Sequence, residues 1–358
     1  MQLIQKLKPH HYRSTGILLL FILLFSFPST IFSQATTQQA NHPVAIAVHG
    51  GAGSLKKLNL TPQQEQAYKD TLAIALQAGY AILKNGGTSV DAVAAAIKVM
   101  EDCTLFNAGR GSVLTHNGSI EMDAAIMNGK NQKAGAVAGV KTIRNPITLA
   151  KMVLDSSKFV LLAGRGAEEF ARDHGIAIVD TSYFFTPYRR LQLQKALTGD
   201  TTPVKLNDTT GMIYPADQNE GDKFGTVGCV AIDRYGNVAA GTSTGGTVNK
   251  NFGRIGDSPL IGCGTYANNK TCAVSCTGHG EDFIRHVVAY DISAMMQYRI
   301  ISLHDAANYV IKTKLTQSKG SGGCIAIDRF GHIEMPFNTE GMFRGYINTR
   351  GQLQVMIY

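Results

Sequence analysis

Residues 224–246 constrain the fold of this chain more than any other stretch, because they combine a strand, a tight turn and a second strand. The run 227–232 is apolar and rich in β-branched side chains, which is typical of a buried strand. Residues 233–237 are typical of a turn, in which Gly236 is free to adopt a positive φ. We therefore predict a strand–turn–strand hairpin around which the rest of the chain is organised.

Thr226 stands at the entrance of the first strand, directly after Gly225. From about residue 195 to 223 the sequence is polar and rich in turn residues, and such a segment buries too little apolar area to order itself. We predict a flexible linker over 195–225 and a chain cut between Gly225 and Thr226. The cut would give Thr226 a free α-amine, whose usual pKa of about 8 lets it accept the hydroxyl proton. The alternative is an ordinary β-branched residue that opens a strand.

Three motifs carry a resemblance to a known family. They are Gly225-Thr226-Val227-Gly228, Thr242-Ser243-Thr244-Gly245-Gly246 and Gly253-Arg254-Ile255-Gly256-Asp257-Ser258-Pro259-Leu260. In this order they resemble the plant-type asparaginase and isoaspartyl peptidase family, whose members are N-terminal-nucleophile hydrolases made as inactive precursors. The resemblance extends over about 43–358. It implies an α+β fold, a four-layer αββα sandwich, made of an α subunit (43–225) and a β subunit (226–358) of one domain.

By this resemblance Thr226 is the nucleophile, and four further residues complete the catalytic site. Thr244 matches a threonine that hydrogen-bonds near the nucleophile, and Asn107 matches an asparagine near the active site. Thr277 and Gly278 match the oxyanion hole, where a hydroxyl and a backbone N–H face the developing negative charge. From the residues alone, Asn107 is equally well explained as a loop residue that bonds its own backbone.

The substrate-binding set by resemblance is Arg254, Asp257 and Gly280. The first two match the pair that grips the substrate's α-carboxylate and α-amine, because a guanidinium forks onto a carboxylate and an aspartate pairs with an ammonium. Without the resemblance, Arg254 and Asp257 would read as a surface ion pair. His279 invites a role as a base, but the amine of Thr226 already fills that role.

The family also holds a structural sodium ion with main-chain carbonyls of one loop. The matching positions here are Met100, Glu101, Cys103, Phe106, Ala108 and Arg110. A cation held by backbone oxygens leaves little side-chain pattern, so only the resemblance implies it. No cofactor is expected for the chemistry itself.

The first forty residues predict export. Lys6, Lys8 and Arg13 precede an apolar run over 16–25, and the small residue Ser33 follows. This pattern is typical of a secretory signal peptide, here 1–33, and predicts a periplasmic or secreted protein. The alternative is an N-terminal membrane anchor, but the run is shorter than the ~20 residues of a membrane span. We therefore expect no stable membrane anchor.

Composition excludes little else. The chain has 358 residues and a net charge of +8, but no basic cluster is interleaved with aromatic residues, so nucleic-acid binding is not expected. No pair of the six cysteines has zinc-ligand spacing with a histidine, and their spacing leaves a disulfide open.

Several further elements can be predicted from the pattern. The apolar run 44–48 predicts a strand, and the glycine-rich segment 49–54 after it predicts a tight turn, since it lacks the Lys and Ser/Thr of a phosphate-binding loop. Helices are expected from Thr61, from near Ser89, over 146–153, over 281–298 and over 302–315. A hairpin is expected around His116-Asn117-Gly118 and a strand over 134–140.

The resulting hypothesis is an autoprocessed amidohydrolase that cleaves β-aspartyl dipeptides and L-asparagine. Its expected partners are a small amino-acid or dipeptide substrate and a second copy, in a dimer of αβ units. A glycosylasparaginase is the closest alternative, although there an Asp typically precedes the nucleophile and here Gly225 does. The other alternative is a non-catalytic ligand-binding protein, which requires an intact chain. The preference between the two substrates stays open.

Overall fold

The computed structural model describes residues 42–53, 55, 60–200 and 225–358. The chain divides into the units Met1–Gln39 and Ala40–Tyr358, and every described residue belongs to the second unit. The predicted signal peptide and the linker residues 201–224 lie outside the described residues. In the part that is described, no helix combines the length and apolar character needed to cross a membrane.

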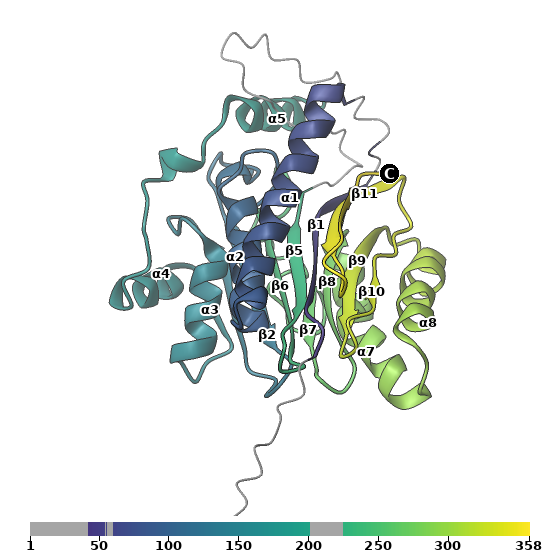
Figure 1. Ribbon diagram of the computed structural model, residues 1–358. Helices are drawn as coiled ribbons and strands as arrows, with labels where there is room; N and C mark the ends of the chain where they lie inside the picture. Colours follow the sequence, from purple (N-terminus) through teal and green to yellow (C-terminus); the bar gives the residue numbers. More distant parts are fainter. Residues whose placement is uncertain (1–41, 54, 56–59, 201–224) are drawn as a thin grey trace, which may run out of the picture. The chain divides into compact units, whose positions relative to one another are not determined.

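Among the described residues, twelve strands form two sheets (Figure 1). The larger sheet has the order β12-β11-β1-β5-β6-β2-β3-β4, with only β3 and β4 parallel among these strands. The smaller has the order β10-β9-β8-β7. The bounds are β1 Ala45–Gly53, β2 Met122–Asn128, β3 Ala134–Val140, β4 Leu161–Ala163, β5 Val227–Ile232, β6 Val238–Thr244, β7 Thr265–Ala267, β8 Cys272–Gly278, β9 Gly322–Asp328, β10 Ile333–Glu334, β11 Gly341–Ile347 and β12 Leu353–Met356.

Helices cover the outer faces of both sheets. The bounds are α1 Pro62–Lys84, α2 Ser89–Glu101, α3 Pro146–Ser156, α4 Gly164–Asp173, α5 Pro187–Thr198, α6 Gly280–His286, α7 Val288–Arg299 and α8 Leu303–Asn308, which continues as a π-helix over Tyr309–Leu315. Figure 1 shows α1, α2 and α3 against the larger sheet and α7 and α8 against the smaller one. With the two sheets packed on each other, the order of layers is α, β, β, α, as predicted.

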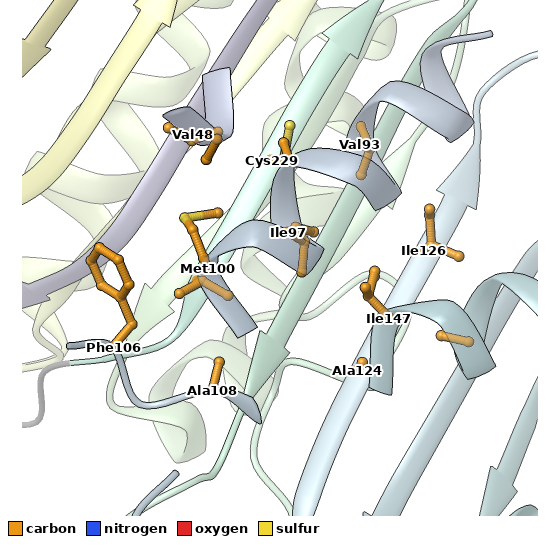
Figure 2. Packing of buried hydrophobic residues seen from close by; sticks show 14 of the residues in the cluster. Val48, Val93, Ile97, Met100, Phe106, Ala108, Ala124, Ile126, Ile147 and Cys229 are labelled. Atoms are coloured by element: carbon orange, nitrogen blue, oxygen red, sulfur yellow. The ribbon is translucent and has the colours of Figure 1, made fainter. Parts of the chain in front are cut away.

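The central strands are buried on both faces because each face has its own core. In β1, Ile46 and Val48 belong to the core under α1 to α3, whereas Ala45 and Ala47 belong to the core between the two sheets. Side chains alternate along a strand, so one apolar run supplies both cores. Figure 2 shows part of the first core, to which Val93, Ile97 and Met100 of α2 and Cys229 of β5 contribute.

Most of the predicted elements are confirmed. Thr61 caps α1 in a full capping box with Gln64, as its sequence indicates. The strand over 134–140 and the helix from Pro146 are also present. Helix α5 extends to Thr198, so it occupies the first residues of the stretch expected to be linker. All six cysteines are described and free, so the structure contains no disulfide between them.

The predicted tight turn over 49–54 is wrong. Strand β1 continues to Gly53, and its pairing with β11 shifts between His49 and Gly51, which marks a β-bulge. The glycine at position 50 is needed because Phe106 covers this segment: a Cβ on Gly50 would lie 2.3 Å from Phe106 Cε1. The glycines therefore serve a close packing contact and not a reversal of the chain.

Two other predictions need correction. Residues 113–115 form no strand, although the turn at His116–Gly118 exists, with Thr115 N donating to Ser119 O at 2.9 Å. The helix expected over 281–298 is divided into α6 and α7 by Val287, whose φ is 50°. A β-branched residue in the left-handed region is uncommon, and local sequence gives no sign of it.

Candidate active site

Thr226 lies immediately before β5, at the start of a central strand of the larger sheet. Its hydroxyl donates to the hydroxyl oxygen of Thr244 at 3.1 Å. The same Thr244 oxygen accepts from the backbone N–H of Gly246 at 3.0 Å. Thr244 is the last residue of β6, so the neighbouring strand ends directly beside Thr226. The structure thus brings these two residues of the expected catalytic set together.

Gly225 adopts a backbone conformation that favours glycine. Its φ is 139°, and a Cβ at this position would lie 2.0 Å from Asn107 Cβ. Any other residue before Thr226 would therefore collide with Asn107. Gly225, the residue before the predicted cut, therefore packs directly against the buried Asn107.

Asn107 is buried and uses its side chain on two distant segments. Its Oδ1 accepts from Val113 N at 2.9 Å, and its Nδ2 donates to Gly246 O at 2.7 Å. Its carbonyl also accepts from Gly245 N at 3.0 Å. Asn107 therefore connects its own loop to the segment after β6, which the interpretation as a simple loop residue does not explain.

Thr277 and Gly278 end β8, on the opposing sheet. Thr242 is two residues before Thr244 in β6, and Ser275 is two residues before Thr277 in β8. Their hydroxyl oxygens lie 2.7 Å apart, across the two sheets. Because side chains alternate along a strand, Thr277 faces the same side as Ser275, as Thr244 does with Thr242. Among the described residues no hydrogen bond joins Thr277 to Thr226, and the place of Thr277 in the site stays a prediction that this strand alignment supports.

Gly280 lies beside both other members of the expected substrate-binding set. A Cβ on Gly280 would lie 2.8 Å from Arg254 Nη2 and 3.0 Å from Asp257 Oδ1. The missing side chain of Gly280 therefore leaves space between a guanidinium and a carboxyl group. An α-amino acid carries the two complementary charges on one carbon.

The guanidinium of Arg254 is oriented by Glu281. Arg254 Nε and Nη2 donate to the two carboxylate oxygens of Glu281, each at 2.9 Å. Although partial burial acts to raise it, these bonds lower the pKa of Glu281 to about 2. The bonds use one side of the guanidinium and leave its Nη1/Nη2 edge for another carboxylate. An ion pair between Arg254 and Asp257 is therefore not what the structure contains.

Asp257 is buried, and within the described part of the chain its Oδ2 has no hydrogen-bond partner. Burial raises the pKa of Asp257 to about 7, against the opposing effect of Arg254. A buried carboxyl group without a partner is costly unless a donor or a cation joins it. Asp257 is therefore suited to receive an ammonium group.

His279 is engaged by acidic side chains. Its Nδ1 lies 3.1 Å from Asp282 Oδ2 and its Nε2 lies 3.3 Å from Glu281 Oε2. Both ring nitrogens of His279 lie against carboxylates, and neither has a hydrogen bond to Thr226. The role of base, assigned to the amine of Thr226, stays a prediction.

The comparison with known proteins decides the family. A family model described as asparaginase matches residues 42–357. The chain belongs to the plant-type asparaginase and isoaspartyl peptidase family. An isoaspartyl peptidase of Salmonella typhimurium is 46% identical over 84% of this chain and 94% of that protein. The isoaspartyl peptidase of Escherichia coli is 46% identical, over 84% of this chain and 92% of its own length. An isoaspartyl peptidase/L-asparaginase of Mus musculus is 40% identical over 80% of this chain and 83% of that protein.

Membership of this family accounts for the architecture. It is a family of N-terminal-nucleophile hydrolases, and the αββα sandwich described above is the fold predicted for it. The catalytic and substrate-binding positions inferred from the motifs lie in the loop after α2, directly before β5, at the ends of β6 and β8, in the loop between β6 and β7, and at the start of α6.

Two residues of this asparaginase-family site are absent from the sequence-based set. Glu281 orients Arg254, and its only sequence signal is that it directly follows Gly280. His49 lies in β1, next to the strand that follows Thr226, and its Nδ1 is 3.1 Å from the carbonyl oxygen of Thr226. The only sequence signal for His49 is its place directly after the apolar run 44–48, and the segment that begins with it was predicted to be a turn.

In the expected sodium loop, the possible ligands are main-chain carbonyl groups. Within the described residues, no three His, Cys, Asp or Glu side chains gather as metal ligands. The loop nevertheless folds back on itself. A Cβ on Gly111 would lie 2.0 Å from Phe106 O and 3.1 Å from Cys103 O, and a Cβ on Gly109 would lie 2.3 Å from Glu101 O. Inward-facing carbonyl oxygens are the donors that a hard cation prefers.

Proposed function

We propose that this protein is an autoprocessed amidohydrolase that cleaves β-aspartyl dipeptides and L-asparagine with Thr226 as its N-terminal nucleophile. The names of the relatives support this substrate class. The observation that carries the proposal is the pairing of the Thr226 and Thr244 hydroxyls at 3.1 Å, directly after Gly225, whose φ is 139°. The alternative, a glycosylasparaginase, gains no support from the structure or the comparisons.

The first reaction is the cleavage of the precursor. The Thr226 hydroxyl attacks the carbonyl carbon of Gly225, and the C–N bond breaks as the nitrogen takes up a proton. The resulting ester joins Gly225 to the Thr226 oxygen. Water then hydrolyses the ester, which releases the carboxylate of Gly225 and leaves Thr226 with a free α-amine. The collision that a side chain on Gly225 would have with Asn107 supports a requirement for glycine at this position.

The second reaction uses the same hydroxyl on an external substrate. The α-amine of Thr226 accepts the hydroxyl proton, and the oxygen attacks the side-chain carbonyl of asparagine or the isopeptide carbonyl of a β-aspartyl dipeptide. The Thr277 hydroxyl and the Gly278 N–H would donate to the oxyanion. Ammonia or an amino acid leaves with the proton, and water hydrolyses the aspartyl ester.

Substrate orientation follows from the charges around Gly280. The free Nη1/Nη2 edge of Arg254 would bind the α-carboxylate, and Asp257 would bind the α-ammonium. These two contacts fix the α-carbon and direct the β-carbonyl toward Thr226. They are independent of the leaving group, so one site can accept both asparagine and a dipeptide.

A structural sodium ion fits the loop that contains Asn107. Main-chain carbonyls of Met100, Glu101, Cys103, Phe106, Ala108 and Arg110 would hold it, and the convergence of oxygens around Gly109 and Gly111 supports this assignment. When bound, the ion would stabilise the packed carbonyl dipoles and keep the loop closed. Asn107 then stays against Gly225. Removal of sodium by dialysis into a lithium or choline buffer should lower the melting temperature, and restored sodium should reverse the change.

Export and assembly complete the proposal. The basic and apolar pattern of residues 1–33 supports removal of a signal peptide and release into the periplasm or beyond. The processed enzyme would be a dimer of αβ units. Mass spectrometry of exported protein tests the first statement, and an uncut N-terminus would contradict it. Light scattering on the purified protein tests the second, and a monomer would contradict it.

The substrate class is tested by one assay on purified, processed protein. β-Aspartyl-leucine, L-asparagine and N-acetylglucosaminyl-asparagine are offered separately, and released aspartate is quantified. We expect hydrolysis of the first two and not of the third. Turnover of the glycosylated substrate alone would favour glycosylasparaginase, and no turnover of any substrate by a processed enzyme would contradict the proposed function.

A further inference from the structure

His49 occupies a space that a glycine keeps open. It lies in β1 directly opposite Gly228 of β5, and it is fully buried. A Cβ on Gly228 would lie 2.2 Å from His49 Nε2 and 2.0 Å from Ser275 Oγ. The imidazole therefore fits between the two sheets only because residue 228 has no side chain. Gly228 is two residues after the proposed nucleophile, so this arrangement is built into the nucleophile's own strand.

The hydrogen bonds of His49 define its protonation. Its Nδ1 lies 3.1 Å from the carbonyl oxygen of Thr226, and a carbonyl oxygen can only accept, so Nδ1 carries the proton. Its Nε2 lies 3.0 Å from Ser275 Oγ and then accepts from that hydroxyl. Burial lowers the pKa of His49 to about 3, against the raising effect of the Thr226 carbonyl, so the ring is neutral at physiological pH.

A row of buried hydroxyl groups continues from Ser275. Thr242 Oγ1 lies 2.7 Å from Ser275 Oγ, and Thr265 Oγ1 lies 2.6 Å from Thr242 Oγ1. The carbonyl oxygens of Gly264 and Ser258 lie 3.1 Å from Thr242 Oγ1 and Thr265 Oγ1, but each hydroxyl has a single proton, which the shorter contact takes. Because the proton of Ser275 is directed to His49, Ser275 accepts from Thr242. Hydrogen bonds that point in one direction reinforce each other, and here they end at the Thr226 carbonyl.

We propose that His49 is a positioning residue for Thr226. By holding the Thr226 carbonyl it fixes the peptide plane between Thr226 and Val227, and with that plane the orientation of the Thr226 backbone. Thr244 holds the hydroxyl of the same residue, so the nucleophile is fixed at two points. The β-bulge between His49 and Gly51 is the local irregularity that accompanies this placement.

This role differs from that of a base. His49 contacts the carbonyl oxygen of Thr226, and its other nitrogen is used by Ser275. It therefore supplies no acceptor to the hydroxyl proton. The inference rests on the proposed function of Thr226, and it predicts loss of turnover without loss of substrate affinity.

Two substitutions separate positioning from packing. The amide nitrogen of Asn occupies the place of imidazole Nδ1, so His49→Asn keeps a donor to the Thr226 carbonyl. The amide of Gln reaches the place of Nε2, so His49→Gln keeps the Ser275 contact and more of the volume but loses that donor. We expect His49→Asn to lower kcat only a few-fold and His49→Gln to lower it on the order of a hundredfold, because small misplacements of a reacting group are costly. KM should be unchanged in both.

The opposite order, with His49→Gln at least as active as His49→Asn, would overturn the proposal, and so would a change confined to KM. His304, which is exposed on α8, supplies the matched control: His304→Asn and His304→Gln should have wild-type kcat. If the His49 variants do not fold, nitrogen NMR of the wild-type enzyme decides. A neutral His49 protonated at Nδ1 supports the proposal, and protonation at Nε2 contradicts it. Failure of the proposed function is distinct, because an active Thr226→Ala enzyme would reveal it.

Discussion

Thr226 and Thr244 are 18 positions apart, yet their hydroxyl oxygens lie 3.1 Å from each other. The register of the β5–β6 hairpin explains this distance. Val227 is opposite Ser243, so Thr226, which precedes Val227, lies opposite Thr244, which follows Ser243. The hairpin that dominates the sequence pattern therefore positions both groups, and no loop has to be ordered to bring them together. A nucleophile fixed by sheet register is pre-organised before substrate arrives.

Arg254→Lys should weaken substrate binding. A lysine ammonium is a point charge and cannot form the fork of two parallel bonds to an α-carboxylate. A charge-assisted hydrogen bond contributes about 1.5–3 kcal/mol, so we expect KM to rise on the order of tenfold or more. The value of kcat should stay within a few-fold if this contact is equal in the ground and transition states. Steady-state kinetics on β-aspartyl-leucine measures both, and unchanged kinetics would remove Arg254 from the site.

Glu281→Gln should also raise KM, though less. The change removes the charge that holds Arg254 Nε and Nη2 in place and leaves the guanidinium free to rotate. We expect an increase in KM of roughly three- to tenfold, as for a lost charged hydrogen bond near the surface. Glu169→Gln, which breaks the remote ion pair with Arg165, is the matched control. A lower KM would mean that Glu281 competes with the substrate carboxylate, contrary to the orienting role.

Substrate affinity should depend on pH through Asp257. Burial raises the pKa of Asp257 to about 7 in the empty site, and only its ionised form attracts an ammonium group. As the pH falls below about 7, the carboxylate is protonated and KM should rise; above pH 7 KM should become constant. The substrate ammonium favours the ionised form, so the pKa of Asp257 should fall in the complex. KM measured from pH 5.5 to 8.5 tests this. Asp257→Asn should have a high, flat profile, and an identical slope in that variant would exclude Asp257.

Gly228→Ala should damage both stability and catalysis. The added methyl would lie 2.2 Å from His49 Nε2 and 2.0 Å from Ser275 Oγ, so the core between the sheets must shift. Overpacking of this kind costs about 1–3 kcal/mol, and urea unfolding can measure it. Gly118→Ala, at a glycine whose φ is 74°, is a control for which the nearest contact is 4.0 Å, so any loss there comes from backbone conformation and not from a collision. Wild-type stability and turnover in Gly228→Ala would contradict the proposed fit of His49.

The sequence predicts best where local physics and topology agree. The apolar run 227–232 and the turn after it specify the β5–β6 hairpin, and Thr61 specifies the start of α1. The catalytic positions came from a resemblance between motifs, and the structure brings Arg254, Asp257 and Gly280 together. What sequence could not reveal depends on distant contacts. Gly50 of β1 belongs to no turn; it leaves room for Phe106, which is far along the chain and packs against it.

The same reason explains why two positioning residues were missed. His49 becomes a partner of Thr226 only when β1 pairs with β5 across 177 positions. Glu281 becomes a partner of Arg254 only when α6 packs beside the loop between β6 and β7. Neither contact produces a local sequence pattern. The break between α6 and α7 at Val287 was also missed, because the surrounding sequence is compatible with one continuous helix.

The central claim is that one hydroxyl, that of Thr226, cuts its own chain and then hydrolyses substrate. The most direct measurement is a denaturing gel of purified wild type, Thr226→Ala and Thr226→Ser, with N-terminal sequencing of every band and an assay on β-aspartyl-leucine. The account predicts two wild-type bands, one of which begins at Thr226. Thr226→Ala should give a single inactive chain, and Thr226→Ser, which keeps a hydroxyl, should still be cut, though more slowly. A Thr226→Ala protein that is cut before residue 226 and hydrolyses the dipeptide would contradict the account, because the nucleophile would then lie elsewhere.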